Sequence, residues 1–125
     1  MAAPHASNPA LPGPTVSKAV VRAAALLGLS QVELSRLLGI SKASTSRLVG
    51  GSYLLEPNRT KEWELALLFV RLFRSLDAVV GHGDEARAWL RGTNAAFGRA
   101  PMEEIITAEG LVRVVQYLDA TRGRV

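Results

Sequence analysis

The 125-residue chain contains no cysteine. This excludes a disulfide scaffold, a thiolate metal site and a thiol nucleophile. Its two histidines, His5 and His82, have no helix-spaced partner of the kind that binds a metal, and His82 alone cannot support a Ser/His/Asp arrangement. Glu103 and Glu104 are placed for helix capping at a helix start rather than for acid–base catalysis. We therefore expect a protein that is not an enzyme and that needs neither a metal nor a cofactor.

Long hydrophobic runs are also missing. The longest extends from Leu65 to Val70 and ends at Arg71, far short of the roughly 20 residues that a membrane-spanning helix needs. The first fourteen residues are rich in Ala and Pro, without the basic start and apolar core of a secretory signal. These features predict a cytoplasmic protein with no membrane contact.

Aromatic residues make up only 6% of the chain, whereas hydrophobic residues make up 48%, with Ala and Leu ahead of Val and Ile. This balance favours helices, and the apolar positions recur at helical spacing, so an all-α fold is predicted. Four prolines break up the start of the chain. The predicted divisions are a flexible tail (1–14), a helical module (15–58), a long central helix (59–82) and a second helical module (83–125).

Positive charge is concentrated in the N-terminal half. Residues 1–60 contain six Lys or Arg against two acids, whereas residues 61–125 contain nine of each sign. A basic module joined to a neutral one suits a protein that meets nucleic-acid phosphates, although a basic protein without such a role has the same charge.

The segment 31–48 has the pattern of a helix-turn-helix. Ser35 is small where two helices must approach, and Gly39 tolerates the positive φ of the turn between them. Leu34, Leu38, Ile40 and Leu48 supply inward apolar side chains, and Thr45 can turn its methyl group inward. Ser30 and Glu33 form a predicted capping box at the start of the first helix.

The outer side of this motif carries suitable DNA-reading side chains. Arg and Lys pair with guanine, the Ala methyl group contacts thymine, and hydroxyl or amide groups at helix starts reach phosphates. The alternative is a helix-turn-helix that serves only as a structural or interaction module. The predicted DNA-binding residues are Gln31, Ser41, Lys42, Ala43, Ser46 and Arg47.

The long helix predicted over 60–80 has two apolar stripes, although one stripe is enough for a helix to pack against a core. The second stripe favours a homodimer, as does the short second helix of the motif, since one such helix contacts few bases and helix-turn-helix proteins read two half-sites across a two-fold axis. The alternative is a central helix buried within one monomer. The predicted dimer contacts are Leu65, Phe69, Leu72 and Leu76.

Residues 16–56 resemble the helix-turn-helix of Xre/Cro-type repressors. The stretch 88–101 contains a Trp-Leu pair at Trp89, then Asn94 and a Gly before Pro101, and Gly110 leads the last helix. This order resembles the C-terminal toxin-binding domain of the Xre/MbcA/ParS antitoxins. The resemblance implies an antitoxin that neutralises a cognate RES-type toxin, which consumes NAD, and that represses its own operon by binding operator DNA.

Within the second module, Trp89 is predicted to pack in the core, with direct contact to the partner as the alternative, and Asn94 is predicted to bond its loop's backbone. The last helix and the Arg-bearing tail are predicted to enter the toxin's pocket, with a solvated end as the alternative. The predicted toxin-binding residues are Val115, Leu118, Asp119, Arg122 and Arg124. Two other functions stay open: a stand-alone repressor with a small-molecule pocket between its modules, and a helical interaction protein that does not bind DNA.

Overall fold

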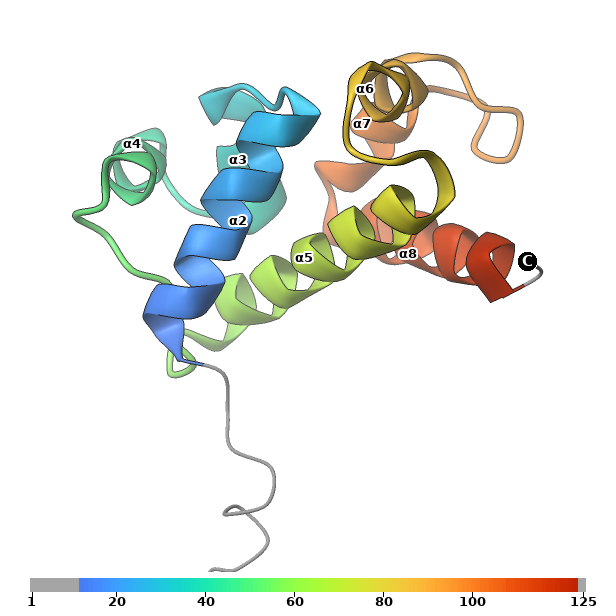
Figure 1. Cartoon of the computed structure of the whole chain (residues 1–125). Helices are drawn as coiled ribbons and strands as arrows, with labels where there is room; N and C mark the ends of the chain where they lie inside the picture. The colour runs from blue at the N-terminus through green and yellow to red at the C-terminus, as the bar shows by residue number, and fades with distance from the viewer. Residues whose placement is uncertain (1–11, 124–125) are drawn as a thin grey trace, which may run out of the picture.

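The computed structural model describes residues 12–123, and in this range it confirms the all-α fold (Figure 1). An isolated bridge between Asn94 and Arg99 is the only strand-like pairing within 12–123. The helices are α2 (Gly13–Leu27), α3 (Gln31–Leu38), α4 (Lys42–Gly50), α5 (Thr60–Val80), α6 (Asp84–Arg91), α7 (Pro101–Ile105) and α8 (Ala108–Gly123).

The long helix α5 connects the two halves of the molecule. It packs against α2 and α3 on the N-terminal side and against α6 and α8 on the C-terminal side. In Figure 1 it runs diagonally, with α2, α3 and α4 at one end and α6, α7 and α8 toward the other. Its buried side chains join those of both groups in one continuous hydrophobic core.

The predicted dimer contacts on α5 are wrong for three of the four residues. Phe69, Leu72 and Leu76 are each 0% exposed within a single chain, because α2, α6 and α8 cover their stripe. Leu65 is half-buried and packs against the same core. The alternative, a central helix buried within the monomer, is therefore the observed arrangement.

Helix α2 begins at Gly13, inside the predicted tail. Pro14 lies in its first turn, where the missing N–H costs no hydrogen bond. The backbone at Gly13 lies so close to the Leu55 carbonyl that a Cβ would come within 2.4 Å of the oxygen. The Ser17 hydroxyl accepts a 2.9 Å hydrogen bond from the Leu55 backbone N–H. The segment after α4 thus packs along the start of α2, and residues 1–11 of the predicted tail lie outside the described range.

Local capping explains where the short helices start. Ser30 accepts from the Glu33 backbone N–H at 3.1 Å, and the Glu33 carboxylate accepts from the Ser30 N–H at 2.9 Å, which confirms the predicted capping box. Ser41 caps α4 by accepting from the Ser44 N–H at 3.0 Å. These caps fix the positions at which α3 and α4 begin.

Candidate functional site

The inward side of α3 and α4 has the predicted helix-turn-helix packing. Leu34, Leu38 and Leu48 are at most 2% exposed. Gly39 ends α3 with φ +71°, the left-handed conformation predicted for the turn. Thr45 is fully buried, and its hydroxyl donates to the Ser41 carbonyl at 2.9 Å. Thr45 therefore takes the inward position without leaving a buried hydroxyl unpaired.

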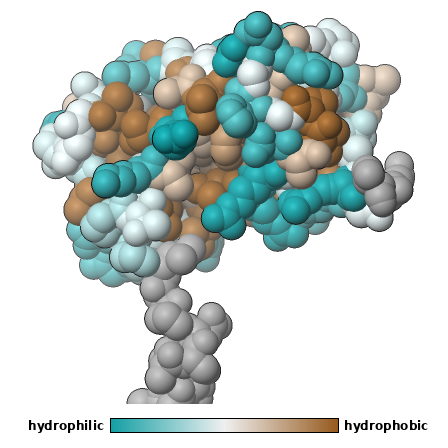
Figure 2. Space-filling model, viewed as in Figure 1, coloured by the Kyte–Doolittle hydropathy of each residue, from teal (hydrophilic) through white to brown (hydrophobic). Residues whose placement is uncertain are grey.

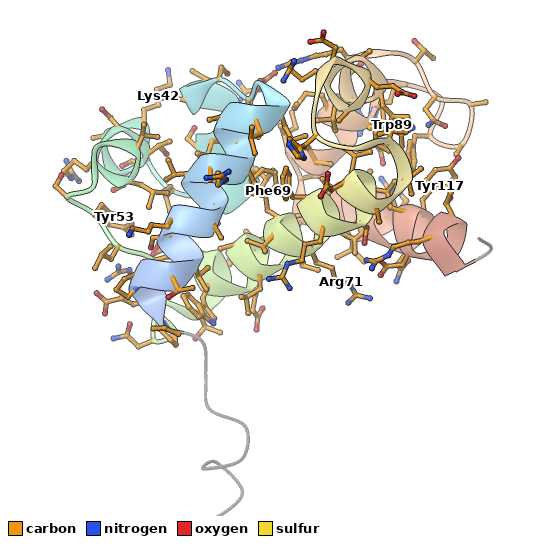
Figure 3. All side chains as sticks on the ribbon, viewed as in Figure 1. Lys42, Tyr53, Phe69, Arg71, Trp89 and Tyr117 are labelled. Atoms are coloured by element: carbon orange, nitrogen blue, oxygen red, sulfur yellow. The ribbon has the colours of Figure 1, made fainter. Side chains whose placement is uncertain are left out.

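The outward side of the motif is free of intramolecular cover. α4 contributes Lys42, Ala43, Ser46 and Arg47 to this exposed side, and Gln31 at the start of α3 is exposed as well. Lys42 lies at the end of the molecule opposite Tyr117 (Figure 3). All six predicted DNA-binding residues are exposed: Gln31, Ser41, Lys42, Ala43, Ser46 and Arg47.

Two arginines of α6 attach the C-terminal helices to this motif. Arg91 forms a bidentate ion pair with Glu33, with N–O distances of 2.5 and 2.9 Å, and donates to the Gly28 carbonyl at 2.8 Å. Arg87 donates to the Leu26 carbonyl at 2.8 Å. Both arginines thus bind carbonyls that the end of α2 leaves unpaired. The Arg91 guanidinium, with the Ser30 N–H, holds the pKa of Glu33 below its usual value despite opposing desolvation.

The loop 92–100 is ordered by Asn94, as predicted. The Asn94 side-chain oxygen accepts from the Ala96 N–H at 2.9 Å. Its backbone accepts from the Gly98 N–H at 2.9 Å and donates to the Arg99 carbonyl at 3.1 Å. This set of bonds folds the loop back so that Arg99 reaches α7.

Glu104 does more than the predicted helix capping. Its side chain is 4% exposed and accepts from Arg99 at 2.5 Å and from Arg113 of α8 at 2.9 Å. The Arg99 bond, followed by the Arg113 bond, lowers the pKa of Glu104 against the opposing effect of burial. The neighbouring Glu103 is exposed and makes the capping bond, to the Ala100 N–H. One buried carboxylate therefore joins the loop, α7 and α8.

An aromatic face forms where α6, the loop and α8 meet. We use this name for Trp89, Phe97 and Tyr117. Tyr117 is 38% exposed; its ring stacks on Trp89 with centroids 6.4 Å apart and meets Phe97 edge-on at 5.2 Å. Trp89 packs against the core, as predicted, but it is only half-buried. Figure 3 shows Trp89 and Tyr117 on the same side of the molecule.

The predicted toxin-binding residues on α8 do not form one surface. Val115 and Leu118 are 2% and 1% exposed and face the core, so neither is available to a partner. Asp119 accepts from Ser75 at 2.7 Å and pairs with Arg71, and Arg122 donates to Ser75 at 3.0 Å. The α8 end is thus bonded back onto α5, and Arg124 lies outside the described residues.

A stand-alone repressor that responds to a small molecule would need a ligand pocket between the two modules. A hollow of about 270 Å³ lies between α3 and α7, but it is open and half of its lining residues are charged (Glu33, Arg36, Arg91 and Glu103). Ligand sites are usually enclosed and apolar. Within residues 12–123 no group of three His, Asp or Glu side chains could hold a metal ion. In that range no helix has the length and apolar character to span a membrane.

Sequence reasoning missed Arg87, Arg91 and the aromatic face. Glu33 and Arg91 are 58 positions apart, so no local pattern links them. The aromatic face combines residues from three separate segments, and only the Trp-Leu pair at Trp89 was visible as a motif.

The fold and these surfaces define an all-helical protein in two parts, with a helix-turn-helix at one end and a second group of helices at the other, on one shared core. Family models identify both parts. The model for the antitoxin Xre-like helix-turn-helix domain matches residues 8–71, just over half of the chain. The model for the antitoxin Xre/MbcA/ParS C-terminal toxin-binding domain matches residues 75–124. The chain belongs to the Xre-type antitoxins, the proteins of toxin–antitoxin systems that carry these two domains. A comparison with curated proteins finds no similar one.

Proposed function

We propose that this antitoxin represses its own operon through the helix-turn-helix and neutralises an NAD-degrading RES-domain toxin through the aromatic face. The observation that supports this division most directly is the separation of the two surfaces. The exposed side of α4 lies at one end of the molecule and the aromatic face at the other (Figure 3). One chain has room to hold DNA and toxin together.

The DNA half of the proposal rests on exposure and chemistry. Lys42 and Arg47 supply charge and guanine-reading donors, and both lie exposed on α4, whose inner side is fully packed. Gln31 is the first residue of α3, where backbone N–H groups attract a phosphate. Repression of the antitoxin's own operon follows if the operator overlaps its promoter.

The toxin half rests on the composition of the aromatic face. Trp and Tyr dominate the residues that contribute most to protein–protein binding, and here they belong to the domain whose family model carries the toxin-binding description. Tyr117 is held in place by two aromatic neighbours, so little side-chain freedom would be lost on binding. RES identity rests on the resemblance of residues 88–118 to the Xre/MbcA/ParS family.

Two measurements test the proposal. Co-expression with the product of the adjacent gene, followed by an NAD-consumption assay, should give a stable complex in which NAD loss is suppressed. Binding to the upstream DNA should weaken steeply as salt rises, since phosphate contacts release counterions. A complex without NAD chemistry would exclude the RES assignment, and DNA binding without a complex would leave a stand-alone repressor.

A further inference from the structure

A hollow lined by arginines is formed by residues of α2, α5 and α8. It has a volume of about 400 Å³, and we name it the arginine hollow. Three guanidinium groups line it, those of Arg71 and Arg74 on α5 and that of Arg122 in the last turn of α8. Figure 2 shows teal side chains beside a brown patch along the course of α5. The volume of the hollow suits a small molecule, since such sites usually measure roughly 300–1,000 Å³.

The positive charge of the arginine hollow is only partly compensated. Among the residues that the structure describes, no acidic side chain lines it. Asp119 pairs with Arg71 from outside the lining, whereas Arg74 makes no ion pair in the described part of the chain. One carboxylate therefore serves three guanidinium groups. The hollow between α3 and α7 differs, because its glutamates match its arginines in number.

Hydrogen bonds from a buried residue hold two of the three guanidinium groups in place. Ser75 is 0% exposed, and its hydroxyl donates to Asp119 at 2.7 Å and accepts from Arg122 at 3.0 Å. The other carboxylate oxygen of Asp119 binds Arg71. Side chains that are already oriented lose little conformational entropy when they bind a ligand. Each guanidinium group has five N–H donors, so most donors of Arg71 and Arg122 stay available to an anion.

The rest of the lining is mostly apolar. Thr15 adds a hydroxyl group, and the other side chains are aliphatic: Val16, Ala19, Leu67 and Val70. Guanidinium groups form bidentate hydrogen bonds with phosphate, and an apolar wall can cover an uncharged part of the same ligand. We propose that the arginine hollow binds a small organic polyphosphate, with the chemistry of a nucleoside di- or triphosphate.

A DNA backbone is a poorer occupant of the arginine hollow. Lys42 lies at the upper left of Figure 3 and Arg71 on the lower side of α5, so a duplex held by α4 would lie away from the hollow. The hollow also joins the two matched domains, because Arg71 belongs to residues 8–71 and Arg122 to residues 75–124. A ligand that contacts both should therefore raise the melting temperature of the chain.

Calorimetric titration of the full-length chain alone, in EDTA and without DNA or toxin, gives a result that is independent of the proposed function. ATP should bind with a dissociation constant on the order of 100 µM. AMP, which has fewer charges, and inorganic tripolyphosphate, which has no apolar body, should each bind about tenfold more weakly. Adenosine should give no measurable heat. The proposal is overturned if ATP does not bind at about 5 mM, or if tripolyphosphate binds as tightly as ATP.

Two further measurements locate the site. Arg74→Ala should weaken ATP binding about tenfold without loss of an intramolecular ion pair. Arg36→Ala removes the same charge from the exposed side of α3, outside the hollow, and should leave the affinity within about twofold.

The second measurement needs no substitution. In an NMR titration, ATP should shift the Nε–H resonances of Arg71, Arg74 and Arg122 and leave that of Arg36 in place. Equal weakening by Arg74→Ala and Arg36→Ala, or equal shifts of all four resonances, would show that ATP follows the net charge of the chain and would overturn the assignment of the hollow.

Discussion

Arg91 donates to both carboxylate oxygens of Glu33, although the two residues are 58 positions apart. The same Glu33 oxygen that Arg91 binds at 2.9 Å also accepts from the Ser30 N–H. One carboxylate thus caps α3 and holds α6. The start of the helix-turn-helix and the C-terminal domain are therefore tied by a bidentate, charge-assisted contact.

We predict that Arg91→Ala lowers the free energy of unfolding by about 1 kcal/mol at pH 7, because the pair is bidentate but partly exposed. The pKa of Glu33 is lowered in the folded protein. Its stabilisation is therefore present above the unfolded pKa and is lost as the pH falls through the lower, folded pKa. Urea titrations at pH 7 and pH 3 measure the difference.

Arg36→Ala is the matched control for this variant, since Arg36 is exposed on α3 and makes no ion pair within residues 12–123. It should change the free energy of unfolding by less than about 0.5 kcal/mol at either pH. If the cost of Arg91→Ala were equal at both pH values, the ion pair with Glu33 would not be its cause.

Glu104→Gln should destabilise the C-terminal domain. The substitution keeps the shape of the side chain but leaves Arg99 and Arg113 without their shared carboxylate. We expect a loss of about 2 kcal/mol in the free energy of unfolding, below the cost of breaking a fully buried pair because both arginines are about half exposed. Urea unfolding followed by circular dichroism at pH 7 measures it.

The adjacent Glu103→Gln serves as the control for Glu104→Gln. Glu103 is exposed, and its carboxylate makes a 3.4 Å capping bond that an amide oxygen can replace. Its cost should stay below about 0.5 kcal/mol. Equal losses for the two variants would mean that helix charge, and not the two-arginine contact, stabilises α7.

The local features of this fold were readable from the sequence because local chemistry determines them. Ser30, Glu33, Gly39 and Ser41 mark helix ends through bonds that span three or four positions. The predicted helix 60–80 agrees with the observed bounds of α5. The start of α2 was missed because proline frequency predicted a tail, whereas one proline in a first turn is compatible with a helix.

The surfaces were harder to predict because they depend on which elements meet. The second apolar stripe of α5 was interpreted as a dimer interface. The periodicity of one helix indicates that a stripe is buried, but it does not show whether the residues that bury it belong to the same chain or to another. Val115 and Leu118 were misassigned for the same reason, since α5 covers the stripe of α8 to which they belong. The exposed side of α4 was predictable because the helix-turn-helix motif fixes both of its sides at once.

Arg47→Ala should weaken binding to operator DNA by about 10- to 100-fold, the effect of losing a base-reading arginine. Arg47 is exposed and its contact within residues 12–123 is a 3.4 Å bond to Ser44, so folding should be unchanged. Fluorescence anisotropy at fixed salt measures the affinity, and toxin inhibition is assayed in parallel.

Arg74→Ala removes one positive charge from α5 and is the control for Arg47→Ala. Arg74 is exposed and distant in sequence from the helix-turn-helix. An equal loss of affinity in both variants would indicate that net charge alone governs DNA binding. Loss of toxin inhibition in Arg47→Ala would contradict the separation of the two surfaces.

Tyr117→Ala should reduce affinity for the toxin about 30-fold, since truncation of a central aromatic residue removes its packing and exposes its neighbours. Tyr117 is 38% exposed, so the folded state should survive. Val112→Ala, on the same helix and 36% exposed, is the matched control and should cost less than threefold. Calorimetric titration with the toxin measures both. Comparable effects would place the toxin on another face of the domain.

Gly110→Ala should be among the most destabilising single substitutions in the chain. A Cβ at this position would lie 1.9 Å from the Glu104 carbonyl oxygen and 2.7 Å from its carbon, both of them backbone atoms that cannot rotate away. The start of α8 would have to move off α7, breaking the 3.1 Å bond from the Gly110 N–H to Thr107 and stretching the Arg113–Glu104 pair. We expect a loss of about 3 kcal/mol or more in the free energy of unfolding, in the range of overpacked cores.

Gly123→Ala is the control: it adds the same methyl group where no atom lies within 4 Å and should change the free energy of unfolding by less than about 1 kcal/mol. Thermal and urea unfolding of both variants decide the matter: a Gly110→Ala protein as stable as the parent would mean that α7 and α8 do not pack this closely.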